Sequence, residues 1–189
     1  MERKNKGEYV VGISREEGCI YGIRLIAELL SRGNEVRLVL SQSLEEAVKS
    51  GNIELCQWLD SLLNKYHEQL IVCDDEVKDA VSGGRYLYDA VIIVPCGREL
   101  FQEMLCESDE DRIAAVAKQC IWEHRPIIIV PERTDITLDY LEEMVKLAGK
   151  GVKIIPAIME MSMRTLSLEE MIDIMVGRIL DSLKIENDI

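Results

Sequence analysis

The sequence lacks long apolar runs, paired cysteine motifs and clustered histidines. Its longest apolar runs are about five residues, far below the roughly 20 that a membrane-spanning helix needs. The six cysteines are dispersed without a C-x-x-C pair, and the two histidines do not stand at metal-binding spacing. The charged start, MERKNKGE, has no apolar stretch behind it that would suit a signal peptide. We therefore expect no membrane span, no disulfide framework, no metal site and a cytoplasmic location.

Basic charge is also scarce. The chain has 22 Lys and Arg residues against 35 Asp and Glu residues, a net charge of −13. This balance argues against nucleic acid and anionic membranes as partners, and an anionic ligand would depend on a few well-placed arginines. With 189 residues, 48% of them hydrophobic, the chain predicts one folded domain over 1–189. The ends, 1–8 and 185–189, are expected to be flexible.

Segments with the apolar spacing of a helix alternate along the chain with short apolar runs typical of strands. Helical patterns cover about 23–30, 53–65, 109–122 and 138–148, and a last one follows the capping pattern Ser167-x-x-Glu170. A second capping pattern, Ser43-x-x-Glu46, predicts a helix start at Ser43. Short strand-like runs separate them: Tyr9–Ile13, Val36–Leu40, Leu70–Cys73, Ala90–Val94, Pro126–Val130 and Val152–Ile155. The alternation predicts an α/β fold, a Rossmann-like doubly wound parallel sheet in a single domain.

Ligands of such sheets bind beyond the carboxyl ends of the strands. Four loops are expected there: Ser14–Gly18, Ser41–Ser43, Pro95–Glu99 and Pro131–Thr134. The first leads into a helix, and glycines before a helix start suit a phosphate. Glu16 and Glu17 at its tip would instead repel one. The residues alone leave both interpretations open.

Several segments together resemble one family. GIS…GCIYGIRL, VIIVPC, EHRPIIIVPERT and SLEEMIDIMVGRILDSL stand in the order and spacing of UbiX-type flavin prenyltransferases, which share a flavoprotein fold with the B subunit of hydroxyarylic acid decarboxylases. The resemblance spans Val10 to Ile185. It implies binding of FMN or prenylated FMN, and transfer of a dimethylallyl group from its phosphate ester to the flavin. It also implies homo-oligomers (trimers packed into dodecamers) with the site between protomers, a separate partner decarboxylase and no metal.

The resemblance also implies a set of site residues. Ser41 matches a flavin-contacting serine, although a serine there could equally cap the following helix. Arg178 matches an arginine that grips the prenyl phosphate, and the implied catalytic residues are Arg178, Arg164 and Glu123. The implied cofactor-binding residues are Gly12, Ser14, Arg15, Gly18, Ser41, Cys96, Gly97, Arg98, Arg125 and Arg133.

The chain departs from the family pattern at several of its charged and aromatic positions. The first loop has Arg15, Glu16 and Glu17 in place of Gly-Ala-Ser. Elsewhere Trp122 replaces a lysine, Glu132 and Arg133 reverse an Arg-Glu pair, and Ser162 replaces a tyrosine. Each lost charge-assisted contact would cost about 1.5–3 kcal/mol of phosphate binding. The hypotheses are an active enzyme with a remodelled site, a non-catalytic flavin carrier, and an accessory subunit of a decarboxylase that has lost flavin binding.

Overall fold

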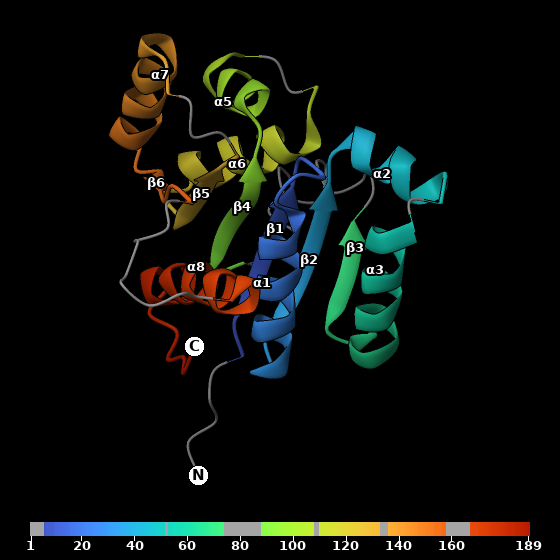
Figure 1. Ribbon diagram of the computed structural model, residues 1–189. Helices are drawn as coiled ribbons and strands as arrows, with labels where there is room; N and C mark the ends of the chain where they lie inside the picture. Colours follow the sequence, from blue (N-terminus) through green and yellow to red (C-terminus); the bar gives the residue numbers. More distant parts are fainter. Residues whose placement is uncertain (1–5, 52, 74–87, 108–109, 133–135, 158–166) are drawn as a thin grey trace.

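A computed structural model describes residues 6–51, 53–73, 88–107, 110–132, 136–157 and 167–189. Six parallel strands form one sheet in the order β3-β2-β1-β4-β5-β6 (Figure 1). Their bounds are β1 Glu8–Ile13, β2 Glu35–Leu40, β3 Leu70–Cys73, β4 Ala90–Cys96, β5 Ile127–Pro131 and β6 Lys153–Ile154. The predicted α/β, doubly wound parallel fold in a single domain is confirmed.

Helices cover both faces of the sheet. They are α1 Cys19–Ser31, α2 Gln42–Lys49, α3 Ile53–Tyr66, α5 Arg98–Leu105, α6 Arg112–Trp122, α7 Leu138–Gly149 and α8 Leu168–Ser182. One core cluster joins the sheet to α1, α3 and α8, and the other joins it to α5, α6 and α7. The central strand β4 is buried along its whole length, which explains its continuous apolar sequence.

Two glycines let helices lie unusually close to the central strands. A Cβ at Gly22 of α1 would stand 2.6 Å from the Val94 carbonyl oxygen in β4, and one at Gly12 of β1 would stand 2.8 Å from Cγ2 of Ile113 in α6. Contacts this short do not occur at a real Cβ, so a side chain at either position would force its neighbour to move, and at Gly22 that neighbour is backbone. Gly12, predicted to bind cofactor, therefore has a structural reason to be glycine, and its cofactor contact stays a prediction.

The predicted elements differ from the observed ones at a few ends. Helix α2 begins at Gln42, and its N-cap is Ser41 rather than Ser43, because the Ser41 hydroxyl accepts the Leu44 amide. The capping box of Ser167 and Glu170 is confirmed. Helix α5 was not predicted, since only Leu100, Phe101 and Met104 of its eight residues are buried and no side chain caps it.

Both ends of the described chain contact the body of the protein. The Gly7 amide donates to Asn34 Oδ1 at 3.0 Å, and Glu8 already belongs to β1. At the other end, Arg32 of α1 donates to the Glu186 carbonyl at 2.7 Å, and the Ile189 carbonyl lies 2.9 Å from where a Cβ of Gly177 would stand. These contacts hold segment 185–189 against α1 and α8, and its expected flexibility stays a prediction.

Candidate functional site

The strand order predicts a ligand-binding crevice between β1 and β4. Both strands lie in the middle of the sheet, and the chain proceeds from them in opposite directions, to β2 and to β5. In open α/β sheets, the connections at such a switch point diverge and leave a crevice at the carboxyl ends of the strands. The loops that follow β1, β2 and β4 surround this point, as the sequence predicted.

Ser14 joins the loop after β1 to the end of β4. Its hydroxyl donates to the Pro95 carbonyl at 3.0 Å and accepts the Gly97 amide at 2.8 Å. The peptide bond between Val94 and Pro95 is cis. Ser14 is 6% exposed, so these bonds lie in a largely buried setting. The structure therefore gives Ser14 a positioning role between two loops of the crevice.

Ser41 has a similar role one strand away. Its hydroxyl lies 3.0 Å from the Ser14 carbonyl, to which it can donate, and 3.4 Å from the Leu44 amide, which it accepts as the N-cap of α2. The sequence left open whether Ser41 caps a helix or contacts a flavin. The cap is present, and the flavin contact stays a prediction.

Gly18 and Gly97 begin the two helices that border the crevice. Gly18 is the N-cap of α1 with φ of 79°, a left-handed conformation that favours glycine. Gly97 is the N-cap of α5 and has ordinary extended geometry. Without side chains, both positions leave the backbone open to close approach. At Gly97 that space is taken, because a Cβ would stand 2.7 Å from Arg15 Nε.

Arg15 lies between two carboxylates from distant parts of the chain, and we call Arg15, Glu99 and Glu132 the Arg15 cluster. Arg15 Nη2 donates to Glu99 in the first turn of α5, and Arg15 Nε lies 3.7 Å from Glu132 Oε2 at the end of β5. The hydrogen bond to Glu99 is the main cause of a raised Arg15 pKa. The guanidinium thus stays charged, with its positive charge balanced within the protein.

Arg98 is directed toward helix α7 and not toward the Arg15 cluster. Its guanidinium lies 5.6 Å from the ring centre of Tyr140, and its Nε is 3.8 Å from Glu143 Oε2. Both contacts belong to the side of α7 that packs on α5. The structure gives Arg98 a role in joining these helices, whereas its predicted role in cofactor binding stays a prediction.

Glu123 and Arg125 lie near the amino ends of the strands, at the opposite end of the sheet from the crevice. They follow α6 and precede the amino end of β5, where Arg125 Nε pairs with Glu123 at 2.6 Å and Nη1 donates to the Tyr88 carbonyl at 2.5 Å. Tyr88 in turn precedes the amino end of β4. Within one chain, therefore, the structure does not bring these predicted site residues together with Ser14 and Gly97.

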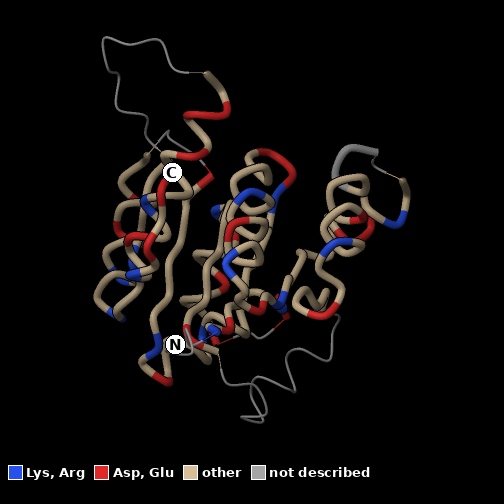
Figure 2. The backbone as a smooth tube through the Cα atoms, turned by 90° about the horizontal axis from the view of Figure 1, so that it is seen from below, with Lys and Arg blue, Asp and Glu red and all other residues tan. Residues whose placement is uncertain are grey.

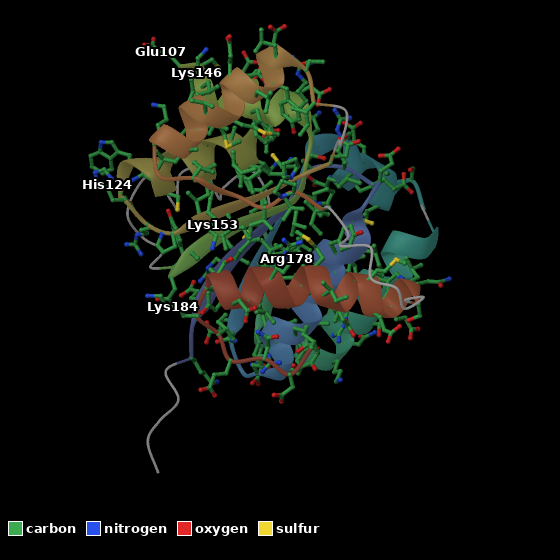
Figure 3. All side chains as sticks on the ribbon, turned by 60° about the vertical axis from the view of Figure 1, so that its left-hand side comes forward. Glu107, His124, Lys146, Lys153, Arg178 and Lys184 are labelled. Atoms are coloured by element: carbon green, nitrogen blue, oxygen red, sulfur yellow. The ribbon has the colours of Figure 1, made fainter. Side chains whose placement is uncertain are left out.

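Arg178 is also separate from the crevice. It lies exposed on α8, which sits nearer the amino ends of the strands than α2 and α5 do (Figures 1 and 3). Figure 3 also shows His124, at the end of α6, extending away from the body of the protein. The predicted site residues Arg133 and Arg164, together with Ser162, lie outside the residues that the structure describes.

Cys96, a predicted cofactor-binding residue, lies in the core beside the loop that leads into α5. It is fully buried at the end of β4, and its Sγ lies 3.7 Å from the Gly97 carbonyl. Burial raises the pKa of this thiol well above its usual value, and the neighbouring carboxylates of Asp111, Glu132 and Glu99 act in the same direction. The thiol therefore stays protonated, which suits packing beneath a ligand better than nucleophilic chemistry.

One feature near the crevice was not found from the sequence. Arg112, 8% exposed at the start of α6, pairs with Glu45 of α2 at 2.7 Å. A polar hollow of about 230 Å³ lies beside this pair, lined by Gln42, Glu45, Glu46, Lys49 and Arg112. The pair joins elements 67 positions apart (112 minus 45), so no local pattern could have revealed it. It anchors α6 beside the loop that follows β2.

Basic and acidic residues are interspersed along the part of the chain that the structure describes (Figure 2). Across the same described ranges there is no group of three or more His, Cys, Asp or Glu side chains that could hold a metal ion. No helix in the part of the chain that the structure describes is long and apolar enough to cross a bilayer.

Comparison with known proteins identifies the family. The Flavoprotein family matches residues 1–181, which is almost the whole chain. The chain belongs to the Flavoprotein family. Over 180 residues it is 28% identical to the flavin prenyltransferase UbiX of Chlamydia muridarum, covering 95% of this chain and 93% of that protein. The predicted UbiX-type flavoprotein is confirmed.

Two solved structures share the fold of this flavoprotein. AnUbiX (PadA1), in complex with FMN and dimethylallyl pyrophosphate, has a TM-score of 0.81 at 23% identity and covers 98% of both chains. The dodecameric FMN-dependent UbiX-like decarboxylase from Escherichia coli O157:H7 has a TM-score of 0.80 at 20% identity and covers 95% of both chains. None of these relatives supports the alternative of a non-catalytic carrier or flavin-free subunit.

Proposed function

We propose that this flavoprotein binds FMN and transfers a dimethylallyl group from its phosphate ester to the flavin. The observation that carries the proposal is the switch point of the sheet at β1 and β4, where Ser14 fixes the loop after β1 to Gly97 at the start of α5. The match of a whole Flavoprotein family domain supports it, as does the similarity to flavin prenyltransferases.

The residues around the crevice fit a flavin mononucleotide. Two helices begin there after Gly18 and Gly97, and a helix start favours an anionic group. At Gly97 an anion would have to take the place of the Arg15 side chain, which lies across this position. Arg15 supplies a guanidinium at the same place, with five N–H groups that suit a phosphate. When bound, FMN supplies the flavin ring that accepts the prenyl group, and Ser14 and Ser41 keep the surrounding loops in position.

The proposed site is completed by a second protomer. Glu123, Arg125 and Arg178 lie away from the crevice of their own chain, so they could serve a crevice only from a neighbouring copy. A solved structural neighbour is dodecameric, which supports an assembly of several copies. A partner decarboxylase that uses prenylated FMN, and a cytoplasmic location, belong to the same proposal.

The test begins with the visible spectrum of the purified protein and the mass of any flavin released on denaturation. The FMN bound to the protein is then reduced with dithionite in the absence of oxygen and dimethylallyl phosphate is added. The released flavin is examined for the added prenyl mass, and the solution for the phosphate that leaves. We expect bound FMN and a prenylated product. Because the Ser14 hydroxyl holds the loop after β1 against Pro95 and Gly97, Ser14→Ala should weaken FMN binding.

Two results would contradict the proposal in different ways. Protein that stays colourless after incubation with excess FMN would exclude flavin binding, and with it the transfer reaction. Protein that binds FMN but yields no prenylated flavin would exclude the reaction while leaving a flavin carrier. Arg178→Ala separates the roles further, because it should reduce product formation and leave FMN binding unchanged.

A further inference from the structure

The Arg15 cluster covers the part of the crevice where a phosphate would approach the backbone. The Arg15 side chain lies across Gly97, 2.7 Å from the position of a Gly97 Cβ, and Glu99 Oε2 lies 3.2 Å from the same position. The three side chains come from the loop after β1, the first turn of α5 and the end of β5. Two carboxylates therefore stand at a helix start that would otherwise favour an anion.

The nearby hydroxyls have already used their hydrogens on the protein. Ser14 donates to the Pro95 carbonyl, and Ser41 is bonded to the Ser14 carbonyl or to the Ser43 hydroxyl. Each hydroxyl has a single hydrogen to give. A phosphate oxygen, which only accepts, therefore gains little from either serine unless an existing bond breaks. Among the residues that the structure describes, Arg15 is a charged donor directly next to Ser14.

The contacts that hold Arg15 are of a kind that a phosphate can replace. The Arg15 side chain is 38% exposed and that of Glu99 is 71% exposed, and the Arg15–Glu132 pair is 3.7 Å apart. Exposed ion pairs are weak, because water screens them and two long side chains must be ordered. A doubly charged phosphate that offers several acceptor oxygens can thus displace both carboxylates from the guanidinium.

We propose that Arg15 binds the phosphate ester of the flavin, and that Glu99 and Glu132 compete with that phosphate for it. The two carboxylates then determine how strongly the protein distinguishes FMN from riboflavin, which has the same ring and no phosphate. This inference rests on the proposed function, since it concerns the flavin site. It assigns the choice between phosphorylated and unphosphorylated flavin to three side chains.

The test compares the dissociation constants of FMN and riboflavin, measured by quenching of flavin fluorescence on the full-length protein. Removing both carboxylate charges with Glu99→Gln and Glu132→Gln should raise the preference for FMN over riboflavin by about tenfold, as expected when a charge-assisted contact gains strength. Riboflavin binding should stay unchanged. Adding Arg15→Gln to the same protein should abolish the gained preference.

Glu8→Gln is the matched control. Glu8 is also a partly exposed carboxylate paired with an arginine, but its partner is Arg37 and the pair lies near the amino ends of β1 and β2. This variant should leave the FMN preference as in the unaltered protein. The inference is overturned if the double variant binds both flavins with the original ratio, or if Arg15→Gln has no effect on that ratio. If neither flavin binds to any variant, the proposed function fails and the inference fails with it.

Discussion

At the residue scale, Gly22 shows how tightly the first helix packs on the sheet. A Cβ at this position would stand 2.6 Å from the Val94 carbonyl oxygen and 2.9 Å from Ile13 Cδ1. The nearest atom belongs to the backbone of β4 and cannot move aside as a side chain can. Gly22→Ala should therefore lower the free energy of unfolding by about 1–3 kcal/mol, as overpacking does.

Gly149 provides the control for that prediction. It is the last residue of α7 and has no neighbour within 4 Å of an added Cβ. Gly149→Ala should leave the stability unchanged or raise it by about 0.4–1 kcal/mol, since alanine restricts the unfolded chain more than glycine does. Urea unfolding of both variants is the measurement. Equal destabilisation by the two substitutions would show that the close approach of α1 and β4 is not the cause.

The buried thiol of Cys120 makes the free energy of unfolding depend on pH in the alkaline range. Burial raises the pKa of its thiol from 9.0 to about 12 in the folded protein. The unfolded chain therefore releases this proton at lower pH than the folded chain does, so the contribution is fully present below pH 9 and is lost as the pH rises toward 12. The loss can reach about 1.4 kcal/mol per pH unit for one such group.

Unfolding in urea at pH 8, 9.5 and 10.5 tests this dependence. The unaltered protein should lose stability across the series, and Cys120→Ala should lose less, because that variant has no thiol to titrate at this position. The substitution also removes a small buried side chain, so the slope against pH is compared and not the absolute stability. Identical slopes for the two proteins would contradict the assignment.

At the scale of elements, most of the fold could be predicted and a few parts could not. The strands were clear because buried β-branched runs leave little alternative, as in the wholly buried β4. Strand β6 proved shorter than predicted, with two residues, because only Lys153 and Ile154 pair with β5. Helix α5 was missed because eight residues give too few turns for a clear period.

The sequence predicted which loops form the candidate site, but it did not predict which side chains contact one another there. Order along the chain places the loops after β1, β2 and β4 at one edge, and the sequence identified all three. Arg15 pairs with Glu99, which lies 84 positions away in the sequence. Arg98, which precedes Glu99 in the first turn of α5, faces the other way, toward Glu143. The direction in which a side chain of α5 points depends on how the helix is oriented, and a local sequence pattern does not reveal that orientation. The position of Arg125 in the sequence, directly before β5, places it near the amino ends of the strands.

Helix α7 presents an apolar stripe to solvent. Leu138, Leu141 and Val145 are 71%, 46% and 69% exposed, while Tyr140 and Leu147 on the other side are buried. Positions separated by three and seven residues share one face of a helix. Exposed apolar side chains that gather on one face are typical of surfaces that contact another protein. Leu141→Glu with Val145→Glu should therefore dissociate the assembly that we propose into smaller species.

Sedimentation velocity or light scattering measures that change. Val72→Glu is a suitable control, because Val72 is also apolar and 43% exposed but lies on the edge strand β3. The control variant should keep the assembly intact. If Val72→Glu dissociates the protein and the α7 variant does not, the contact between copies uses the β3 edge and not α7.

At the scale of the whole molecule, one crevice depends on many distant parts. The sheet brings three loops to one edge, Ser14 binds two of them together, and Arg112 anchors α6 to α2 beside them. Helices cover both faces of the sheet, so a ligand reaches the backbone at the carboxyl ends of the strands. A substitution in the packing behind the crevice, such as Gly22→Ala beside Val94 and Ile13, would therefore alter flavin binding through the position of β4.

The carboxylates near the crevice have a consequence for how fast a charged ligand arrives. Glu16 and Glu17 are exposed beside the Arg15 cluster, and the whole chain carries a net charge of −13. A diffusing phosphate ester is repelled before it touches the protein, and dissolved ions shorten the reach of that repulsion from about 30 Å at 0.01 M salt to about 8 Å at 0.15 M. Stopped-flow association of FMN should therefore become faster as salt is added, with riboflavin unaffected, the reverse of the slowing that salt causes where a basic surface attracts its ligand.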